Sequence, residues 1–396
     1  MERLRLVVLG SMGLHPFGGQ AWLYLNWLSG LRRLGHDVYY VEDHSTWFFD
    51  PVRNAYVSEA DYAAGLISHV LSEVQLSDKW ALRSTLETTE MRGMTEDELN
   101  DLYKNCDALL NIIGATQLDD DHPALNASYR IFVETDPVSN QLRLHNGDDK
   151  VRHNFDRHHA IFTYGENYGA PDCGVPVGDI SYLKTRQPVD LALWPHTFTP
   201  ESETFTTIGN YRQDDIAPWV QDLVYEGVTY QWSKHYEWEQ FISMPSITGE
   251  SFEMCTTIRE ATDEDKLVSA GWKLAPAIPR TLDVLGAYRR YIQGSRAEFT
   301  VAKDQNVRLR SGWFSERSVC YLASGKPVIA QDTAFSAVLP TGYGLFSFQS
   351  LEEAAAAVEE IKRDYPGNCT AAREIAQEYF ETTRVVDAFL TDAGLT

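Results

Sequence analysis

Residues 308–333, RLRSGWFSERSVCYLASGKPVIAQDT, combine residue types that bind phosphate with residue types that bind sugar hydroxyls. Apolar residues at helical spacing predict a helix over 314–323, and Gly325 suits its C-terminal cap. The start of such a helix has free backbone N–H groups and a positive dipole end, which favour an anion. We therefore predict a phosphate site there, formed by Arg308, Arg310, Ser311, Gly312, Trp313 and Ser315.

A buried strand is predicted directly after this helix. Residues 328–330, Val-Ile-Ala, form the short apolar run typical of a parallel strand that is covered on both faces. Open α/β sheets bind ligands at the carboxyl ends of their strands, so Asp332 and Thr333 are predicted to contact sugar hydroxyls. Both residue types also favour N-caps, and a cap for the next short helix is the alternative. A phosphate site and a hydroxyl-binding turn on one strand–helix unit indicate a sugar nucleotide.

The same segment resembles the donor-binding unit of GT-B glycosyltransferases. Gly325, Pro327, Val328 and Ile329 reproduce the GxPVI that closes their donor helix. Residues 311–313, Ser-Gly-Trp, are similar to the CGW of the plant-type donor box, with two more residues before the proline. The nearest resemblance is to bacterial family-1/family-4-like enzymes of the CgeB-related kind.

One position departs from the pattern of these families. Seven residues before the proline they place a glutamate that binds the ribose hydroxyls, and this chain has Cys320 there. Glu316 lies one helical turn earlier on the same face, so it is the substitute candidate for the ribose contact. A capping or ion-pairing role for Glu316 is the alternative.

Alternating strands and helices predict a doubly wound parallel sheet in the first half of the chain. A strand over 4–9, a glycine-rich loop over 10–19, a helix over 20–34 and a strand over 38–41 form its opening unit. The resemblance implies two Rossmann-like domains that face each other across a cleft. The expected limits are 1–190 for the acceptor-side domain, 200–370 for the nucleotide-sugar domain, and 371–396 for helices that cross back.

His15 is the first candidate for the base that deprotonates an acceptor hydroxyl. It lies in the loop after the first strand, where inverting enzymes of this fold often keep a histidine, and a histidine of near-neutral pKa suits the task. A histidine on a surface loop is the alternative. Glu42 and Asp43, at the end of the second predicted strand, are candidates either to orient His15 or to act as the base.

Two further loops are predicted to approach the donor. Gly18 and Gly19 allow close contact with a ligand, although a purely conformational role explains them equally well. Asn210 and Arg212 follow the first strand of the second domain, where the resemblance implies contact with the donor phosphates. An ordinary turn is the alternative there.

Composition excludes several classes of protein. With 57 acidic and 34 basic residues the net charge is −23, which argues against a nucleic-acid partner. Five scattered cysteines indicate reduced thiols in the cytoplasm, and no apolar run is long enough for a membrane span. The Asp-Asp-Asp-His run at 119–122 is expected to be a solvated loop, and the resemblance implies that no metal and no cofactor is required.

The first functional hypothesis is therefore a metal-independent glycosyltransferase. It moves a sugar, a hexose by the resemblance, from a nucleoside-diphosphate donor, with UDP or TDP favoured, to a small-molecule or glycan acceptor. A sugar-nucleotide epimerase of the same fold and a non-enzymatic two-domain ligand-binding protein are the alternatives. A DNA-modifying glycosyltransferase is a further alternative, which the acidity weakens.

Overall fold

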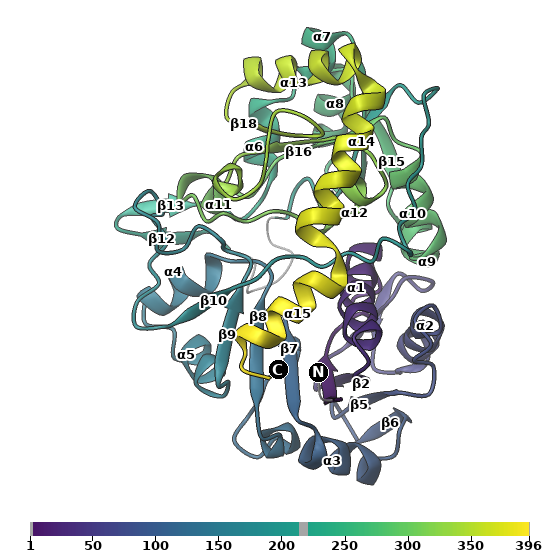
Figure 1. Ribbon diagram of the computed structural model, residues 1–396, viewed down its shortest axis with the longest axis vertical. Helices are drawn as coiled ribbons and strands as arrows, with labels where there is room; N and C mark the ends of the chain where they lie inside the picture. The colour runs from purple at the N-terminus through teal and green to yellow at the C-terminus, as the bar shows by residue number, and fades with distance from the viewer. Residues whose placement is uncertain (1–2, 214–220, 396) are drawn as a thin grey trace.

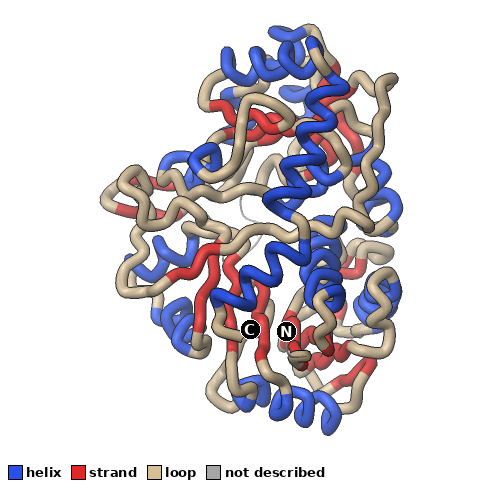
Figure 2. The backbone as a smooth tube through the Cα atoms, in the orientation of Figure 1, coloured by secondary structure: helices blue, strands red, loops and turns tan. Residues whose placement is uncertain are grey.

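Two parallel sheets organise the chain, one above the other along the long axis of the molecule (Figure 2). The computed structural model describes residues 3–213 and 221–395. The first sheet has the strand order β10-β9-β8-β7-β1-β2-β5-β6, and the second has the order β15-β14-β11-β16-β17-β18. Within the described strands of these sheets, only the pair β5–β6 is antiparallel.

The strands of the first sheet are β1 (Arg5–Leu9), β2 (Asp37–His44), β5 (Trp80–Ser84), β6 (Glu90–Gly93), β7 (Ala108–Ile112), β8 (Arg130–Glu134), β9 (Ala160–Thr163) and β10 (Tyr182–Lys184). Those of the second sheet are β11 (Thr204–Ile208), β14 (Ser251–Thr256), β15 (Lys273–Pro276), β16 (Ala297–Thr300), β17 (Val328–Gln331) and β18 (Leu345–Phe348). Two small antiparallel ribbons are formed by β3 (Phe48–Asp50) with β4 (Ala55–Val57), and by β12 (Leu223–Tyr225) with β13 (Val228–Tyr230).

The helices around the first sheet are α1 (Gly18–Arg33), α2 (Asp61–Ser72), α3 (Glu96–Asn105), α4 (Ser139–His145) and α5 (Asp149–Asp156), with a 3₁₀ turn η1 (Pro123–Asn126). The later helices are α6 (His235–Gln240), α7 (Met244–Thr248), α8 (Ala261–Ser269), α9 (Ile278–Leu282), α10 (Gly286–Gln293), α11 (Asp304–Arg308), α12 (Glu316–Ala323), α13 (Leu351–Arg363), α14 (Tyr365–Ile375) and α15 (Thr382–Asp392). A 3₁₀ turn η2 (Phe335–Ala337) and a π-helical turn η3 (Ala376–Phe380) complete them.

The strand orders confirm the predicted fold class, two Rossmann-like doubly wound units. In the first sheet β1 lies between β2 and β7, and in the second β11 lies between β14 and β16. The order in which strands are added to each sheet reverses beside β1 and beside β11. Such switch points leave a crevice outside the carboxyl ends of the strands. We call the parts built on the two sheets the first and second domains.

The local signals in the 308–333 segment correspond to real elements. The helix α12 begins at Glu316, two residues later than the apolar spacing predicted, and β17 follows it. Gly325 adopts a φ of +73° after the helix, a conformation that favours glycine.

The last helix packs against the first domain. Figure 1 shows the yellow helices α14 and α15 running from the second domain down across the first. In α15, Thr382 Oγ1 donates to the backbone carbonyl of Asn26 in α1 at 2.7 Å, and the rings of Phe389 and Trp27 meet edge to face. Within the described residues, no helix combines the length and apolar character needed to cross a membrane.

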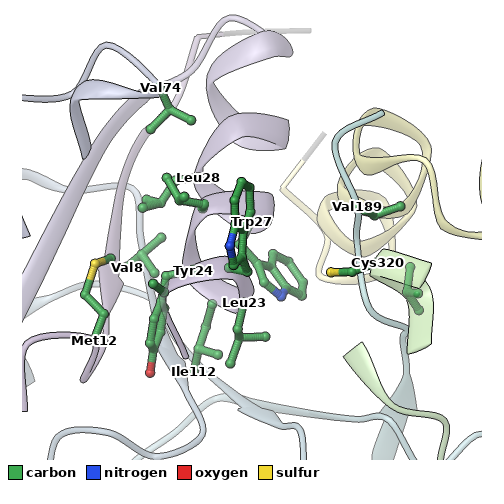
Figure 3. Packing of buried hydrophobic residues seen from close by; sticks show 14 of the residues in the cluster. Val8, Met12, Leu23, Tyr24, Trp27, Leu28, Val74, Ile112, Val189 and Cys320 are labelled. Carbon is green, nitrogen blue, oxygen red and sulfur yellow. The ribbon is translucent and has the colours of Figure 1, made fainter. Parts of the chain in front are cut away.

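One hydrophobic core continues from the first domain into α12. Figure 3 shows Trp27, Tyr24 and Leu28 of α1 in the same cluster as Cys320 of α12. Cys320 is 2% exposed. A glutamate at this position would be buried among apolar side chains, which is costly for a charged group.

Candidate functional site

Two adjacent cavities lie where the carboxyl ends of the two sheets face each other. The first, of about 300 Å³, is bounded by the ends of β11, β14 and β15 and by the first turn of α1; we call it the β15 cavity. The second, of about 540 Å³, is bounded by the ends of β7 and β8, by α4 and by residues of the second domain; we call it the β8 cavity. Gln20 and Glu316 line both cavities, so the two adjoin at these side chains.

Two lysines of the second domain line the β8 cavity beside aromatic rings. Lys303 Nζ lies 3.4 Å from the centre of the Trp232 ring, and Lys234 Nζ lies 5.4 Å from that of Trp313. Lys303 also forms an ion pair with Asp136 at 2.5 Å, whereas Lys234 forms none with any residue in the described ranges. Burial, together with the positive charges of Arg317 and Lys303, lowers the pKa of Lys234 to about 7. An anion in this cavity would find an unpaired cation and raise that pKa again.

Arg317 adds a third cation at the boundary of the cavities. It lines the β15 cavity, and its guanidinium is held by Glu298 at 2.5 Å, by the carbonyl of Ile208 at 2.6 Å and by Thr300 Oγ1 at 2.7 Å. These contacts fix the side chain across the ends of β11 and β16. Neither Lys234 nor Arg317 was predicted from the sequence, because neither belongs to a recognisable motif.

Glu316 occupies the start of α12 and faces both cavities. Burial raises the pKa of its carboxyl group, and a hydrogen bond from its own backbone N–H opposes the rise. The helix start therefore points into the junction of the cavities, as the phosphate hypothesis requires. Its first N–H group, however, is already used by Glu316 itself.

Ser311 and Gly312 have structural roles that the sequence did not predict. Ser311 is fully buried and donates to Asn306 Oδ1 at 2.7 Å. Gly312 has a φ of +81°, donates to the carbonyl of Thr333 at 2.7 Å, and would place a Cβ 2.3 Å from the backbone nitrogen of Asn167. Both residues are packed inside the domain junction and line neither cavity, and their contact with phosphate stays a prediction.

The two arginines before α12 are also bound elsewhere. Arg308 pairs with Asp304 at 3.1 Å and donates to the carbonyl of Thr229, and Arg310 pairs with Asp172 at 2.8 Å. Neither lines the β15 cavity or the β8 cavity. Carboxylates hold both side chains away from the two cavities, and contact of Arg308 and Arg310 with the phosphate stays a prediction.

The residues after β17 are turn-forming. Asp332 is 4% exposed, and its Oδ1 accepts from the backbone N–H groups of Ala334 and Ser336 at 3.0 and 3.3 Å. Thr333 Oγ1 donates to the carbonyl of Trp313. These bonds favour the alternative of a cap over a sugar contact. Ser315 stands at the N-cap of α12 without a side-chain cap bond and lines neither cavity.

Several predicted donor contacts do reach the cavities. Gly18, Gly19 and Asn210 line the β15 cavity, and Trp313 lines the β8 cavity while its Nε1 donates to the carbonyl of Thr135 at 2.9 Å. Arg212 lines neither, because Asp263 binds its Nε and Nη2 at 2.6 and 2.9 Å.

Of the three catalytic candidates, Glu42 lies beside the loop of His15, whereas Asp43 has different partners. Glu42 is fully buried and accepts hydrogen bonds from the backbone of Gly13 at 2.6 Å and Leu14 at 3.1 Å, so it holds the loop that carries His15. Burial lowers the pKa of His15, and the negative charge of Glu42 partly opposes this. His15 lines neither cavity, and its role as a base stays a prediction.

Asp43 points to a different part of the first domain. It is bound by Arg83 Nε at 2.7 Å and by the Tyr103 hydroxyl at 2.9 Å. Burial alone would raise the pKa of Asp43, but hydrogen bonds and charges of His122 and Arg83 hold it below its ordinary value. Neighbouring residues of a strand face opposite sides, so Asp43 cannot share the partners of Glu42.

Comparison with known proteins locates this arrangement among solved structures. The sequence matches no family model and no curated protein. The structure is similar to an alpha-glucosyltransferase in complex with UDP and a 13-mer DNA, at 13% identity over 100% of both chains, with a TM-score of 0.60. It is also similar to Anabaena HepE in complex with UDP and glucose (11% identity, 100% of both chains, TM-score 0.57). A third similar structure is AviGT4, a glycosyltransferase involved in avilamycin A biosynthesis (11% identity, 98% of this chain and 96% of that one, TM-score 0.52).

Proposed function

From the GT-B fold that this chain shares with those structures, we propose that the protein is a glycosyltransferase that uses a nucleoside-diphosphate sugar. The observation that carries the proposal is the pair of adjoining cavities with Lys234 and Lys303 beside their boundary. One cavity suits a nucleoside, the other a sugar with its acceptor, and the cations lie where the diphosphate between them would pass.

The β15 cavity is suited to the nucleoside and the first phosphate. Gly18 and Gly19 open α1, which has no side-chain cap at Phe17, so the dipole end of this sixteen-residue helix faces the cavity. Arg317 lies on the opposite wall, and Glu316 is placed where it can accept from ribose hydroxyls. Two helix starts and a fixed guanidinium thus converge on one cavity.

The lysines define how the reaction would be assisted. Cleavage of the bond between the sugar and the phosphate leaves negative charge on the nucleoside diphosphate, and Lys234 and Lys303 would stabilise it. They supply the positive charge that a metal ion supplies in other transferases, so we propose that transfer is metal-independent. The UDP bound in the alpha-glucosyltransferase and HepE structures supports UDP as the nucleotide, and the glucose in HepE supports a hexose.

For the acceptor and the cellular compartment, only a general class is proposed. We propose a small-molecule or glycan acceptor, because the net charge of −23 disfavours nucleic acid even though one similar structure contains DNA. Five free cysteines support the cytoplasm as the compartment.

Glu134, Asp136 and Glu316 around the β8 cavity also favour a second function, epimerisation of the sugar nucleotide. An epimerase would turn UDP-glucose alone into a new sugar nucleotide.

A thermal-shift screen with UDP, TDP, GDP and ADP tests the proposal. The preferred diphosphate is expected to stabilise the folded protein by about 2.7 kcal/mol at a concentration of about 100 Kd, which raises Tm by several degrees. The matching nucleoside monophosphate should give a smaller shift, since it lacks the phosphate assigned to the lysines. Equal melting temperatures with all four diphosphates and without ligand would reject the proposed function.

A further inference from the structure

The ion pair between Lys303 and Asp136 connects the two domains inside the β8 cavity. Lys303 follows β16 of the second domain, and Asp136 follows β8 of the first. Their charged atoms are 2.5 Å apart, with the Lys303 side chain 10% exposed and the Asp136 side chain 45% exposed. Both residues line the cavity assigned to the sugar and the acceptor.

A diphosphate would compete with Asp136 for Lys303. A phosphate oxygen offers the lysine a more highly charged partner than a single carboxylate. Lys234 is a second cation for the same diphosphate, because it lies close enough to Lys303 for the charge of Lys303 to lower the pKa of Lys234. Once Lys303 turns to the diphosphate, Asp136 loses the one ion-pair partner that it has among the described residues. Its carboxylate would then face the cavity as a free acceptor of protons.

We propose that Asp136 is the catalytic base, and that the donor diphosphate uncovers it by taking Lys303 away. This inference rests on the proposed function, because it requires a diphosphate in the cavity. It goes further by naming the base and by making the base available only after the donor has bound.

The neighbouring candidates are less suited to this role. Both carboxylate oxygens of Glu134 already accept hydrogen bonds, from Asn140 and Gln141 on one oxygen and from Gln141 and Thr163 on the other. The carboxyl group of Glu316 accepts a hydrogen bond from its own backbone N–H, which is not displaceable by a ligand on another residue. His15 lines neither cavity. Asp136 alone among these has a single displaceable partner.

The chemical step balances as a single displacement. The acceptor O–H proton passes to the Asp136 carboxylate while the acceptor oxygen forms a bond to the anomeric carbon. The bond from that carbon to the diphosphate oxygen breaks, and its electron pair leaves with the nucleoside diphosphate. Attack opposite to the leaving group inverts the configuration at the anomeric carbon, and an ordered mechanism with the donor first follows from the ion pair.

The test uses the full chain carrying Asp136→Asn, with the diphosphate selected from UDP, TDP, GDP and ADP and its glucose conjugate as probes. Loss of the competing carboxylate should tighten diphosphate binding about 2- to 5-fold, the range for a partly exposed ion pair. Turnover, measured as release of diphosphate from the glucose conjugate with water as the acceptor, should fall about 100-fold. A purely structural role of Asp136 would not tighten binding while slowing turnover.

Two further variants make the outcome decisive. Asp172→Asn removes another ion pair between the domains, with Arg310, outside the cavities, and should change neither quantity beyond about 2-fold. His15→Ala tests the alternative base, and loss of turnover there with an active Asp136→Asn would overturn the inference. Diphosphate affinity that is unchanged or weaker in Asp136→Asn would overturn it as well. Failure of the wild type to bind any of the four diphosphates would instead reject the proposed function itself.

Discussion

Replacing Lys234 and Lys303 together with methionine is expected to weaken UDP binding about a thousandfold. Each lysine contributes a charge-assisted hydrogen bond to the diphosphate worth roughly 2 kcal/mol, so the two contribute about 4 kcal/mol. Methionine keeps much of the length and apolar contact of the lysine stem against Trp232 and Trp313. Isothermal titration calorimetry with UDP measures the loss directly.

The same lysines predict a dependence on pH with a definite sign. The pKa of Lys234 is about 7, and a bound diphosphate would raise it. Binding therefore takes up a proton above about pH 7, and UDP affinity should fall as pH rises, by up to tenfold per unit. Titrations in buffers of different ionisation enthalpy should show uptake approaching one proton near pH 8, and Lys234→Met should abolish it.

Lys326→Met is the matched control for these variants. Burial lowers the pKa of Lys326 also, to about 8, but its Nζ bonds to Thr199 Oγ1 at the opposite end of α12. This variant is expected to lower stability and leave UDP affinity unchanged. A double variant that binds UDP as tightly as the wild type would show that the diphosphate does not lie between the two lysines.

Local patterns were sufficient to predict the strand–helix unit from 308 to 333. Helical spacing of apolar residues, a glycine after the helix and a short apolar strand are signals within one segment, and α12 and β17 follow them. Alternation of such units was enough to predict a doubly wound sheet in the first half of the chain, and the resemblance to GT-B glycosyltransferases implied the second. These inferences needed no information about contacts between distant residues.

The candidate site depended on contacts that no local pattern encodes. Arg310 was predicted to bind phosphate from its position before the helix, yet its partner Asp172 lies 138 positions earlier in the chain. Gly312 likewise contacts Asn167, a residue far away in the sequence, across the domain junction. Lys234 lies in an aromatic and charged stretch without any motif, so only the fold places it beside Trp313. One error was avoidable, since the two-residue period of a strand already separates Glu42 from Asp43.

Gly18→Ala is expected to weaken UDP binding roughly 10- to 100-fold by keeping the domains apart. A Cβ at Gly18 would lie 2.3 Å from Cδ2 and 2.9 Å from Cβ of Tyr288, which belongs to α10 of the second domain. Rotation of the Tyr288 ring cannot relieve the contact with the Cβ atom of Tyr288. Because Tyr288 is also only 3% exposed, α1 and α10 must separate. Overpacking of this kind costs roughly 1–3 kcal/mol. Because Phe17 to Gln20 and Tyr288 line the same cavity, that separation also dismantles the nucleoside site.

Gly19, the next residue of α1, provides a milder substitution for comparison with Gly18→Ala. A Cβ at Gly19 would come no closer than 3.8 Å to the Tyr288 hydroxyl, so Gly19→Ala should weaken binding far less. Gly65→Ala, in α2, places its Cβ in open space and serves as the control for the substitution itself. Small-angle scattering should show a larger radius of gyration for Gly18→Ala alone. Wild-type affinity in Gly18→Ala would mean that the nucleoside binds away from the contact between α1 and α10.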